Sequence, residues 1–250
     1  RSLQFYSTVR LPAYGVGIVY SPAGDCIAVG CADGSVLVVD IKTRTVRETF
    51  KEPRGLYCCQ FSHDGKILAT TYPTVALTLR DVRTGTIMHS FPERTMVMVR
   101  GVAFTPDDKR IIGCTPDSTV CVWDVVSGSV VHTIPLPGVG RSVALSSSGS
   151  LLAIGCTGDV VALFDAANDF APIAELRAAT GAVPVCFSPV PGSDLLLVCG
   201  DSIKTIAVWD VHDIRARRTP VEISFLKHTH TFTDATFSCD GAFVATGGTD

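Results

Sequence analysis

A short apolar segment that ends in aspartate recurs along the chain, and its regular spacing limits the possible folds more than any other feature. In the clearest copy, residues 119–124, the segment ends in Trp123-Asp124 and continues through Ser127-Gly128. The recurring aspartates follow one another at intervals of 41, 43, 41 and 45 residues; they are Asp40, Asp81, Asp124, Asp165 and Asp210. A constant period in the forties predicts an array of similar units that stack on one another.

A second marker precedes these aspartates and keeps step with them. It is an aromatic or aliphatic residue followed by Ser or Thr and a turn; its copies begin at Tyr20, Phe61, Phe104, Leu145, Phe187 and Phe237. Pro and Gly within these turns fit the backbone angles that tight turns require. Each unit holds four short strands, which in the first unit cover residues 16–20, 26–30, 35–40 and 45–50. The pattern predicts an all-β fold, a β-propeller of four-stranded antiparallel sheets called blades.

The pairs Trp123-Asp124 and Trp209-Asp210, at the ends of third strands, resemble the signature of the WD-repeat family. The resemblance covers the whole chain and implies a single propeller domain over residues 1–250, truncated at both ends. About five and a half blades of a seven-bladed ring are expected, with a six-bladed ring as the alternative. The expected blades are residues 14–50, 55–91, 97–134, 139–177, 182–226 and the partial blade 231–250, and residues 4–9 form the last strand of a preceding blade.

In that family a His, a Ser or Thr, an Asp and the Trp can form a buried hydrogen-bonded chain within a blade. The last repeat matches most of it, since His228 lies nine residues before Phe237 and is followed by Thr246 and Asp250. The other repeats lack the His, so we expect their blades to depend more on apolar packing. The residues with an implied structural role are Trp123, Asp124, Trp209, Asp210, Asp33, Asp117, His228, Thr246 and Asp250.

The composition fits a domain of buried strands. Apolar residues make up 46% of the chain and charged residues 18%, which suits blades that bury both faces of their strands. No apolar run approaches the roughly 18 residues that a membrane-spanning helix needs, so the sequence predicts a soluble protein with no membrane span. A formal net charge of −3 gives no general reason to expect nucleic acid.

The ten cysteines have neither metal-ligand nor disulfide spacing, and nearly all fall in predicted strands. Since free Cys is among the most buried residue types, we interpret them as thiols in a reducing compartment. This predicts a cytoplasmic protein, with nuclear, cytoskeletal or ciliary association left open. We expect no metal and no cofactor.

Motifs for catalysis are missing from the sequence. The six histidines stand singly in turns or strands, without a nucleophile elbow, and there is no phosphate-binding loop. His228 and His230 share a strand-like segment and would supply half of a metal site, with a capping and a surface role as the alternative. We predict that the protein is not an enzyme.

Propeller loops are a common location for function. By the family's geometry, loops between successive blades lie on a face often used for partners. Arg100 and Arg141 each lie four residues before their markers, so we expect equivalent positions near the channel mouth, suited to acidic or phosphorylated segments. The predicted partner-binding residues are Arg54, Arg94, Arg100, Arg141, Arg177, Tyr14, Tyr57 and Met98. The alternative is that these arginines are solvated rim charges, some paired with Glu52 and Glu93.

A basic loop offers a different function. Three arginines within a short loop could hold the phosphates of lipid headgroups or nucleic acid; they are Arg215, Arg217 and Arg218. This phosphate-reading module is the first alternative to protein docking.

A third reading comes from the segment Arg80-Asp81-Val82-Arg83, which resembles the Trp-Asp-x-Arg box of cullin-ligase substrate receptors, with Arg in place of Trp. The function that the family resemblance implies first remains a non-catalytic scaffold that docks other proteins within a larger multiprotein assembly.

Overall fold

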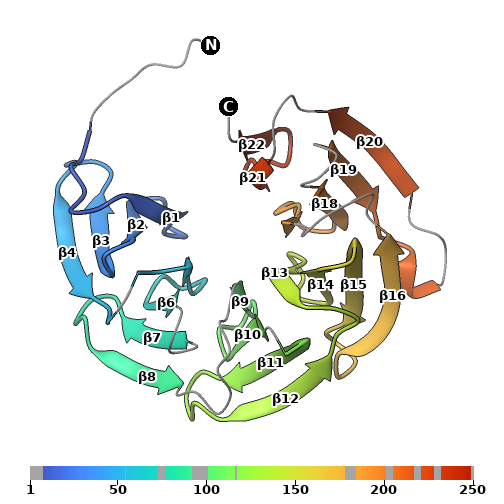
Figure 1. Ribbon diagram of the computed structural model, residues 1–250, viewed down its shortest axis with the longest axis horizontal. Coiled ribbons are helices and arrows are strands. Elements are labelled where there is room, and N and C mark those ends of the chain that lie inside the picture. Colours follow the sequence, from blue (N-terminus) through green and yellow to red (C-terminus); the bar gives the residue numbers. More distant parts are fainter. Residues whose placement is uncertain are drawn as a thin grey trace. The chain divides into compact units, whose positions relative to one another are not determined.

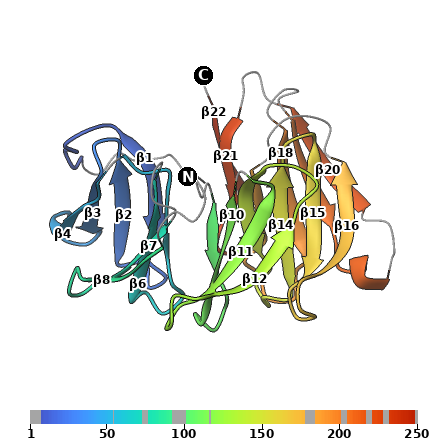
Figure 2. The same ribbon diagram turned by 60° about the horizontal axis from the view of Figure 1, so that its bottom comes forward.

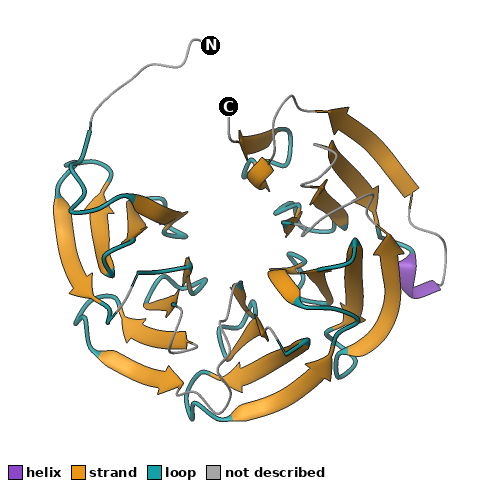
Figure 3. Cartoon of the chain, in the orientation of Figure 1, coloured by secondary structure: helices purple, strands orange, loops and turns teal. Residues whose placement is uncertain are grey.

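A computed structural model describes residues 8–53, 55–72, 77–91, 101–115, 117–177, 184–200, 205–216, 221–227 and 232–248. The chain divides into two compact units, Arg1–Val99 and Arg100–Asp250. In both units the described residues form short strands joined by turns and loops, as Figure 3 shows.

The first unit contains two four-stranded antiparallel sheets, the first two blades (Figure 1). The strands of blade 1 are β1 (Gly15–Tyr20), β2 (Cys26–Cys31), β3 (Ser35–Asp40) and β4 (Val46–Lys51). The strands of blade 2 are β5 (Cys58–Phe61), β6 (Ile67–Thr71), β7 (Leu77–Asp81) and β8 (Ile87–Phe91). Each sheet pairs its strands in chain order, so neighbouring strands are joined directly.

The second unit contains three four-stranded sheets and one two-stranded sheet (Figure 2). Blade 3 consists of β9 (Val102–Phe104), β10 (Arg110–Thr115), β11 (Thr119–Asp124) and β12 (Val130–Pro135). Blade 4 consists of β13 (Gly140–Leu145), β14 (Leu151–Cys156), β15 (Val160–Asp165) and β16 (Ala171–Arg177). Blade 5 consists of β17 (Val185–Phe187), β18 (Leu195–Gly200), β19 (Thr205–Asp210) and β20 (Val221–Lys227), with the 3-10 helix η1 (Ile214–Ala216) before its last strand. The two-stranded sheet is β21 (Phe232–Phe237) and β22 (Val244–Gly248).

The marker Ser or Thr fastens the turn between the first and second strands of a blade. In blade 2, Ser62 Oγ accepts the N–H of Ile67 at 2.9 Å and donates its own hydroxyl to Asp64 at 2.8 Å. The same bond to the start of the second strand recurs at Ser21, Thr105, Ser146 and Ser238. The marker recurs because its side chain completes this turn.

The aspartate that ends the third strand organises the following turn. Asp81 Oδ1 accepts the N–H of Thr84 at 2.7 Å and its hydroxyl at 2.9 Å, and Asp124 makes the same two bonds to Ser127. A short acceptor side chain at this position satisfies backbone donors that the turn leaves unpaired. This local requirement explains the periodic aspartate.

Apolar side chains fill the junctions between consecutive blades within each unit. In the first unit, one core cluster includes Ala28 and Val38 of blade 1 and Phe61 and Leu68 of blade 2. In the second unit, separate clusters fill the junctions of blades 3 and 4 and of blades 4 and 5. Strand β14 is buried at every position, since neighbouring blades cover both of its faces.

The expected all-β fold of four-stranded antiparallel blades is confirmed, and β21 and β22 pair as the first two strands of a partial blade. The predicted last strand of a preceding blade, residues 4–9, lies for the most part outside the described residues. The single domain over residues 1–250 and the seven-bladed ring stay predictions.

Candidate partner-binding groove

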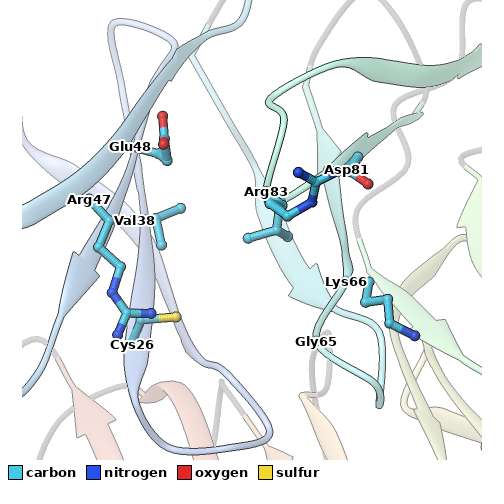
Figure 4. A pocket seen from close by; sticks show the side chains of 9 residues that line it. Cys26, Val38, Arg47, Glu48, Gly65, Lys66, Asp81 and Arg83 are labelled. Carbon is cyan, nitrogen blue, oxygen red and sulfur yellow. The ribbon is translucent and has the colours of Figure 1, made fainter.

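A groove with a volume of about 500 Å³ opens at the junction of blades 1 and 2 (Figure 4). Blade 1 contributes residues of β2, β3 and β4, and blade 2 contributes residues at its two turns. The lining residues are Cys26, Val38, Arg47, Glu48, Gly65, Lys66, Asp81, Val82 and Arg83. This volume lies within the range of pockets that hold small ligands, so the groove can accept a few residues of a peptide.

The floor of the groove is apolar. Cys26 and Val38 are 5% and 2% exposed and belong to the core cluster between the two blades, against which Val82 also packs. Val38 and Glu48 lie opposite each other in the β3–β4 ladder, so their side chains project from the same face of blade 1. The groove is therefore the open outer part of the apolar junction between the blades.

Two turns of blade 2 form the opposite wall, as Figure 4 shows. The turn between β5 and β6 carries Gly65 and Lys66, and the turn between β7 and β8 carries Val82 and Arg83. The N–H of Val82 donates to the carbonyl oxygen of Lys66 at 2.9 Å. This backbone bond ties the two turns into one wall.

Arg47, on the wall of blade 1, is neutralised by two aspartates. Its Nη1 lies 2.7 Å from Asp25 Oδ2 and its Nη2 lies 2.6 Å from Asp40 Oδ2. The backbone N–H of Thr43 and the guanidinium of Arg47 together lower the pKa of Asp40 to about 2. Arg47 is thus occupied by its own blade.

Two exposed charges remain available at the groove. Lys66 is neutralised by Asp64, whose Oδ2 lies 2.8 Å from Lys66 Nζ; this contact is the main reason that the pKa of Asp64 falls to about 2. Glu48 and Arg83 are exposed and form no ion pair with any other described residue. In Figure 4 they lie on opposite walls, so the groove presents a carboxylate and a guanidinium beside an apolar floor.

A buried ion pair beside the groove holds the turn that carries Arg83. Arg80 Nη2 lies 2.9 Å from Glu52 Oε1, and the two side chains are 8% and 1% exposed. Arg80 Nη1 donates to the carbonyl oxygen of Gly85, in the same turn, at 2.6 Å, and the guanidinium lies 5.1 Å from the centre of the Phe50 ring. Because Phe50 and Glu52 come from the end of blade 1, Arg80 fastens the wall of blade 2 to blade 1.

This ion pair was missed from the sequence, although its spacing could have revealed it. Glu52 occupies the place of the family's His, nine residues before the marker Phe61. Thr70 occupies the place of the Ser or Thr, and its hydroxyl donates to Glu52 Oε1 at 3.3 Å. Arg80 occupies the place of the Trp, one residue before the strand-ending aspartate. A search of the His position for any polar residue would have identified Glu52.

Of the residues predicted to bind partners, the four that the structure describes do not line this groove. Tyr14 and Tyr57 are 77% and 41% exposed in the first unit, while Arg141 and Arg177 are exposed on β13 and β16 of the second. The others lie outside the described residues: Arg54, Arg94, Arg100 and Met98. The equivalence of Arg100 and Arg141 therefore stays a prediction.

The residues with an implied structural role lie mainly in turns and junctions. Four of the aspartates accept hydrogen bonds from backbone or hydroxyl donors in their turns: Asp33, Asp117, Asp124 and Asp210. Trp123 is buried, and Trp209 is partly buried against the core between blades 4 and 5. Thr246 is exposed on β22, and His228 and Asp250 lie outside the described residues.

Arg215, predicted to read phosphates, is engaged within the second unit. Its Nη2 donates to the carbonyl oxygen of Ser150 at 2.6 Å and to Asp165 Oδ1 at 2.9 Å, which fastens η1 to blade 4. A phosphate at this loop would have to compete with both bonds. Arg217 and Arg218 lie outside the described residues.

In the part of the chain that the structure describes, no cluster of three or more His, Cys, Asp or Glu could hold a metal ion. No helix of that part has the length and apolar character to span a membrane. A smaller cavity of about 330 Å³ in the second unit has a mostly apolar lining, and Glu175 is the one charged residue among the described residues that line it.

Comparisons with known proteins relate these blades to characterised repeats. Residues 85–124 match the family described as "WD domain, G-beta repeat". The chain is 27% identical over 242 residues to Periodic tryptophan protein 2 of Arabidopsis thaliana, which covers 93% of this chain and 25% of that protein. It is 33% identical over 90 residues to Retinoblastoma-binding protein homolog 5 of Caenorhabditis elegans, covering 36% of this chain and 20% of the relative. It is 31% identical over 109 residues to U3 small nucleolar RNA-associated protein 18 homolog of Drosophila melanogaster, covering 43% of this chain and 21% of the relative. The chain thus spans a quarter or less of the length of these three relatives.

Proposed function

Since the chain belongs to the WD-repeat family, we propose that it is a non-catalytic scaffold that docks other proteins within a larger assembly. The observation that carries this proposal is the groove between blades 1 and 2, where the exposed charges of Glu48 and Arg83 flank an apolar floor. Both walls belong to hydrogen-bonded sheets and turns, so a partner meets a preformed site and little conformational entropy is lost on binding.

The names of two relatives support a role in association. One is named a retinoblastoma-binding protein and the other a U3 small nucleolar RNA-associated protein. Because the aligned regions cover only about a fifth of each relative, their particular partners are not assigned to this chain. From these names we propose for this chain only that it associates with a larger assembly.

We place the scaffold in the cytoplasm, in keeping with its free and mostly buried cysteines among the described residues. The name of one relative refers to the nucleolus, which makes the nucleus the alternative compartment. Fluorescence microscopy of the tagged whole protein separates the two, since a nucleolar signal would contradict the cytoplasmic placement.

A cullin-ligase substrate receptor is a second candidate, favoured by the position of Asp81, Val82 and Arg83 on the groove wall. Arg80, which stands where the Trp-Asp-x-Arg box has Trp, is buried, whereas Arg83 is exposed. On this reading Arg83→Ala abolishes co-precipitation with a cullin ligase from cell extract. If the unaltered chain does not co-precipitate with a cullin ligase, or if the Arg83→Ala variant still does, this candidate is excluded.

Affinity capture with chemical cross-linking tests the scaffold proposal. The baits are the tagged whole chain and the variant Glu48→Lys/Arg83→Glu, which reverses both available charges of the groove. The control bait is Lys109→Glu, which reverses an exposed charge in the second unit. We expect the double variant to lose a discrete set of cross-linked proteins that the control retains.

Two other outcomes of this capture are informative. If the double variant retains every cross-linked protein, the groove is not the docking site, and Arg141→Glu then examines the loop surface predicted from the sequence. If the unaltered chain cross-links no protein, the scaffold proposal fails.

A further inference from the structure

The groove between blades 1 and 2 can be compared with equivalent places in the second unit. Val38 and Glu48 face each other across β3 and β4, as Val122 and His132 do across β11 and β12. Both valines lie two residues before the aspartate that ends the third strand. The junction of blades 1 and 2 and the junction of blades 3 and 4 therefore match residue by residue.

At the junction of blades 3 and 4, this place is occupied by Phe170. The side chain is 4% exposed and belongs to the core cluster that includes Val122, and its ring meets the His132 ring edge-on with centroids 5.4 Å apart. Asp169, the residue before it, places Oδ1 3.1 Å from His132 Nε2. One large apolar side chain and one charged neighbour from the β15–β16 turn close this junction.

At the junction of blades 4 and 5, Ile214 has the same role. The equivalent cross-strand pair is Leu163 and Ala174. Ile214 of η1 is 4% exposed and lies in the core cluster that includes Leu163 and contacts Ala174. The next residue, Arg215, bonds to Asp165 of blade 4 at 2.9 Å. A large apolar residue beside a charged one thus closes a second junction.

The turn between β7 and β8, which the structure describes in full, supplies no such side chain to blade 1. Asp81 donates its N–H to the carbonyl of Thr86, five residues later, whereas Asp165 pairs with Ala171, six residues later. The blade 2 turn is therefore one residue shorter than the blade 4 turn, and beyond Val82 it contains only Arg, Thr and Gly before Thr86. The place that Phe170 fills elsewhere stays open above Val38.

We propose that this groove binds a peptide segment of a partner protein that inserts one large apolar side chain over Val38 and pairs an adjacent basic residue with Glu48. The inference rests on the proposed scaffold function and specifies the segment that the scaffold accepts. Glu48 stands at the position of His132, whose partner in the closed junction is acidic; a carboxylate at that position selects a basic partner instead.

The remaining charges at the groove are compatible with this segment. Arg47 and Lys66 are neutralised by neighbouring aspartates, so they repel a basic ligand little. Arg83, on the opposite wall, supplies a guanidinium donor for a carbonyl or carboxylate oxygen of the same segment. The apolar floor and the two outer charges together favour a short extended peptide with a single apolar anchor.

The turn that closes the junction of blades 3 and 4 supplies the probe. A fluorescein-labelled peptide of residues 167–172 that carries Asp169→Lys presents a basic residue beside the phenyl ring of Phe170. We expect it to bind the whole chain saturably, as measured by fluorescence anisotropy. The same peptide with Phe170→Ala should lose binding, and the peptide with the original Asp169 should bind about tenfold more weakly.

Variants of the whole chain show where the probe binds. Val82→Phe places a ring in the groove and should remove binding while the circular dichroism spectrum stays unchanged. Glu48→Lys should reverse the preference, so that the Asp169 peptide becomes the tighter ligand. The matched control Glu175→Lys reverses an exposed carboxylate of the second unit and should leave both affinities unchanged.

Several outcomes would overturn the inference: no saturable binding up to about 1 mM peptide, binding that survives in Val82→Phe, or a peptide preference that Glu48→Lys does not alter. If the groove-dependent capture of partner proteins persists in any of these cases, the assigned segment is wrong and the scaffold proposal stands. Peptide binding without any captured protein would instead contradict the scaffold proposal.

Discussion

The guanidinium of Arg80 and the carboxylate of Glu52 form an ion pair with 2.9 Å between Nη2 and Oε1, although their side chains are only 8% and 1% exposed. Charged groups removed from water in this way stabilise a fold only when partners satisfy them. Here Thr70 donates to the same carboxylate, and Gly85 accepts from the same guanidinium. The pair joins two consecutive blades at positions where the family has His and Trp.

Removing one partner of this pair should destabilise the first unit strongly. We expect Glu52→Ala to lower the free energy of unfolding by about 3–5 kcal/mol, because Arg80 is left charged and buried. Urea unfolding followed by circular dichroism measures the change. The control Glu48→Ala removes an exposed carboxylate of the same unit and should cost no more than about 0.5 kcal/mol.

A double-mutant cycle distinguishes the ion pair from simple loss of packing. If Glu52→Leu and Arg80→Met together cost much less than the sum of the two single substitutions, the buried charges are coupled as described. Additive effects would show that the two side chains act independently.

A glycine in the turn of blade 4 is required for two separate reasons. Gly149 has φ +70°, and a Cβ at this position would lie 2.6 Å from Pro106 of blade 3, whereas Gly24 has φ +68° with open space around it. Gly24→Ala should therefore cost only the backbone strain, about 1–2 kcal/mol, and Gly149→Ala should cost about 1–3 kcal/mol more because it overpacks the junction. Thermal unfolding of the two variants gives the comparison, and equal losses would show that Pro106 yields without cost.

Acid should weaken the first unit within a defined pH range. A hydrogen bond from Lys51 is the main cause that lowers the pKa of Asp33 to about 2, and Lys66 has the same effect on Asp64. A carboxyl group whose pKa is lower in the folded than in the unfolded state stabilises the fold above its unfolded pKa, about 4. This contribution is lost as the pH falls from about 4 to about 2.

Urea unfolding midpoints measured at several pH values across this range test the acid effect. The variant Lys51→Met/Lys66→Met should show a smaller decrease in the midpoint between about pH 4 and pH 2. A decrease as large as that of the unaltered chain would place the acid-sensitive groups elsewhere.

The thiols should differ sharply in reactivity. Burial raises the pKa of Cys59 and of Cys156 to about 12, so almost no thiolate forms at neutral pH, while Cys239 is exposed in a turn. Brief alkylation with iodoacetamide followed by mass spectrometry should find label on Cys239 and none on Cys59 or Cys156. The chain unfolded in urea, which should be labelled at all three, is the control; label on Cys59 before Cys239 would contradict the described burial.

The blades could be predicted from the sequence because each periodic residue has a local cause. Ser62 completes a turn with Asp64 and Ile67, and Asp81 completes the next turn with Thr84, so every repeat needs the same residue types at the same spacing. Such short-range requirements are visible in a single sequence. The partner-binding surface predicted from Arg141 has no local cause of this kind, and it stays a prediction.

The groove could not be predicted because it depends on distant segments that leave a space between them. Val38 and Glu48 lie on blade 1, and the space above them depends on the length and side chains of the blade 2 turn after Asp81. Sequence periodicity shows which positions are equivalent, but only packing shows which of them remain unfilled. Glu52 and Arg80 stand at the positions where the family has His and Trp. A sequence search for His and Trp does not find this charged pair, so its role could not be predicted in this way.

The turn between β15 and β16 is one residue longer than the turn between β7 and β8. The turns of blades 1 and 3 have the shorter length too, since Asp40 and Asp124, like Asp81, donate to a carbonyl oxygen five residues later. In an array that grows by duplication, one residue inserted into such a turn converts an open junction into an internal contact while every strand keeps its sequence. The sealed junction then displays, within one chain, the apolar anchor and charged neighbour that an open copy can take from a partner.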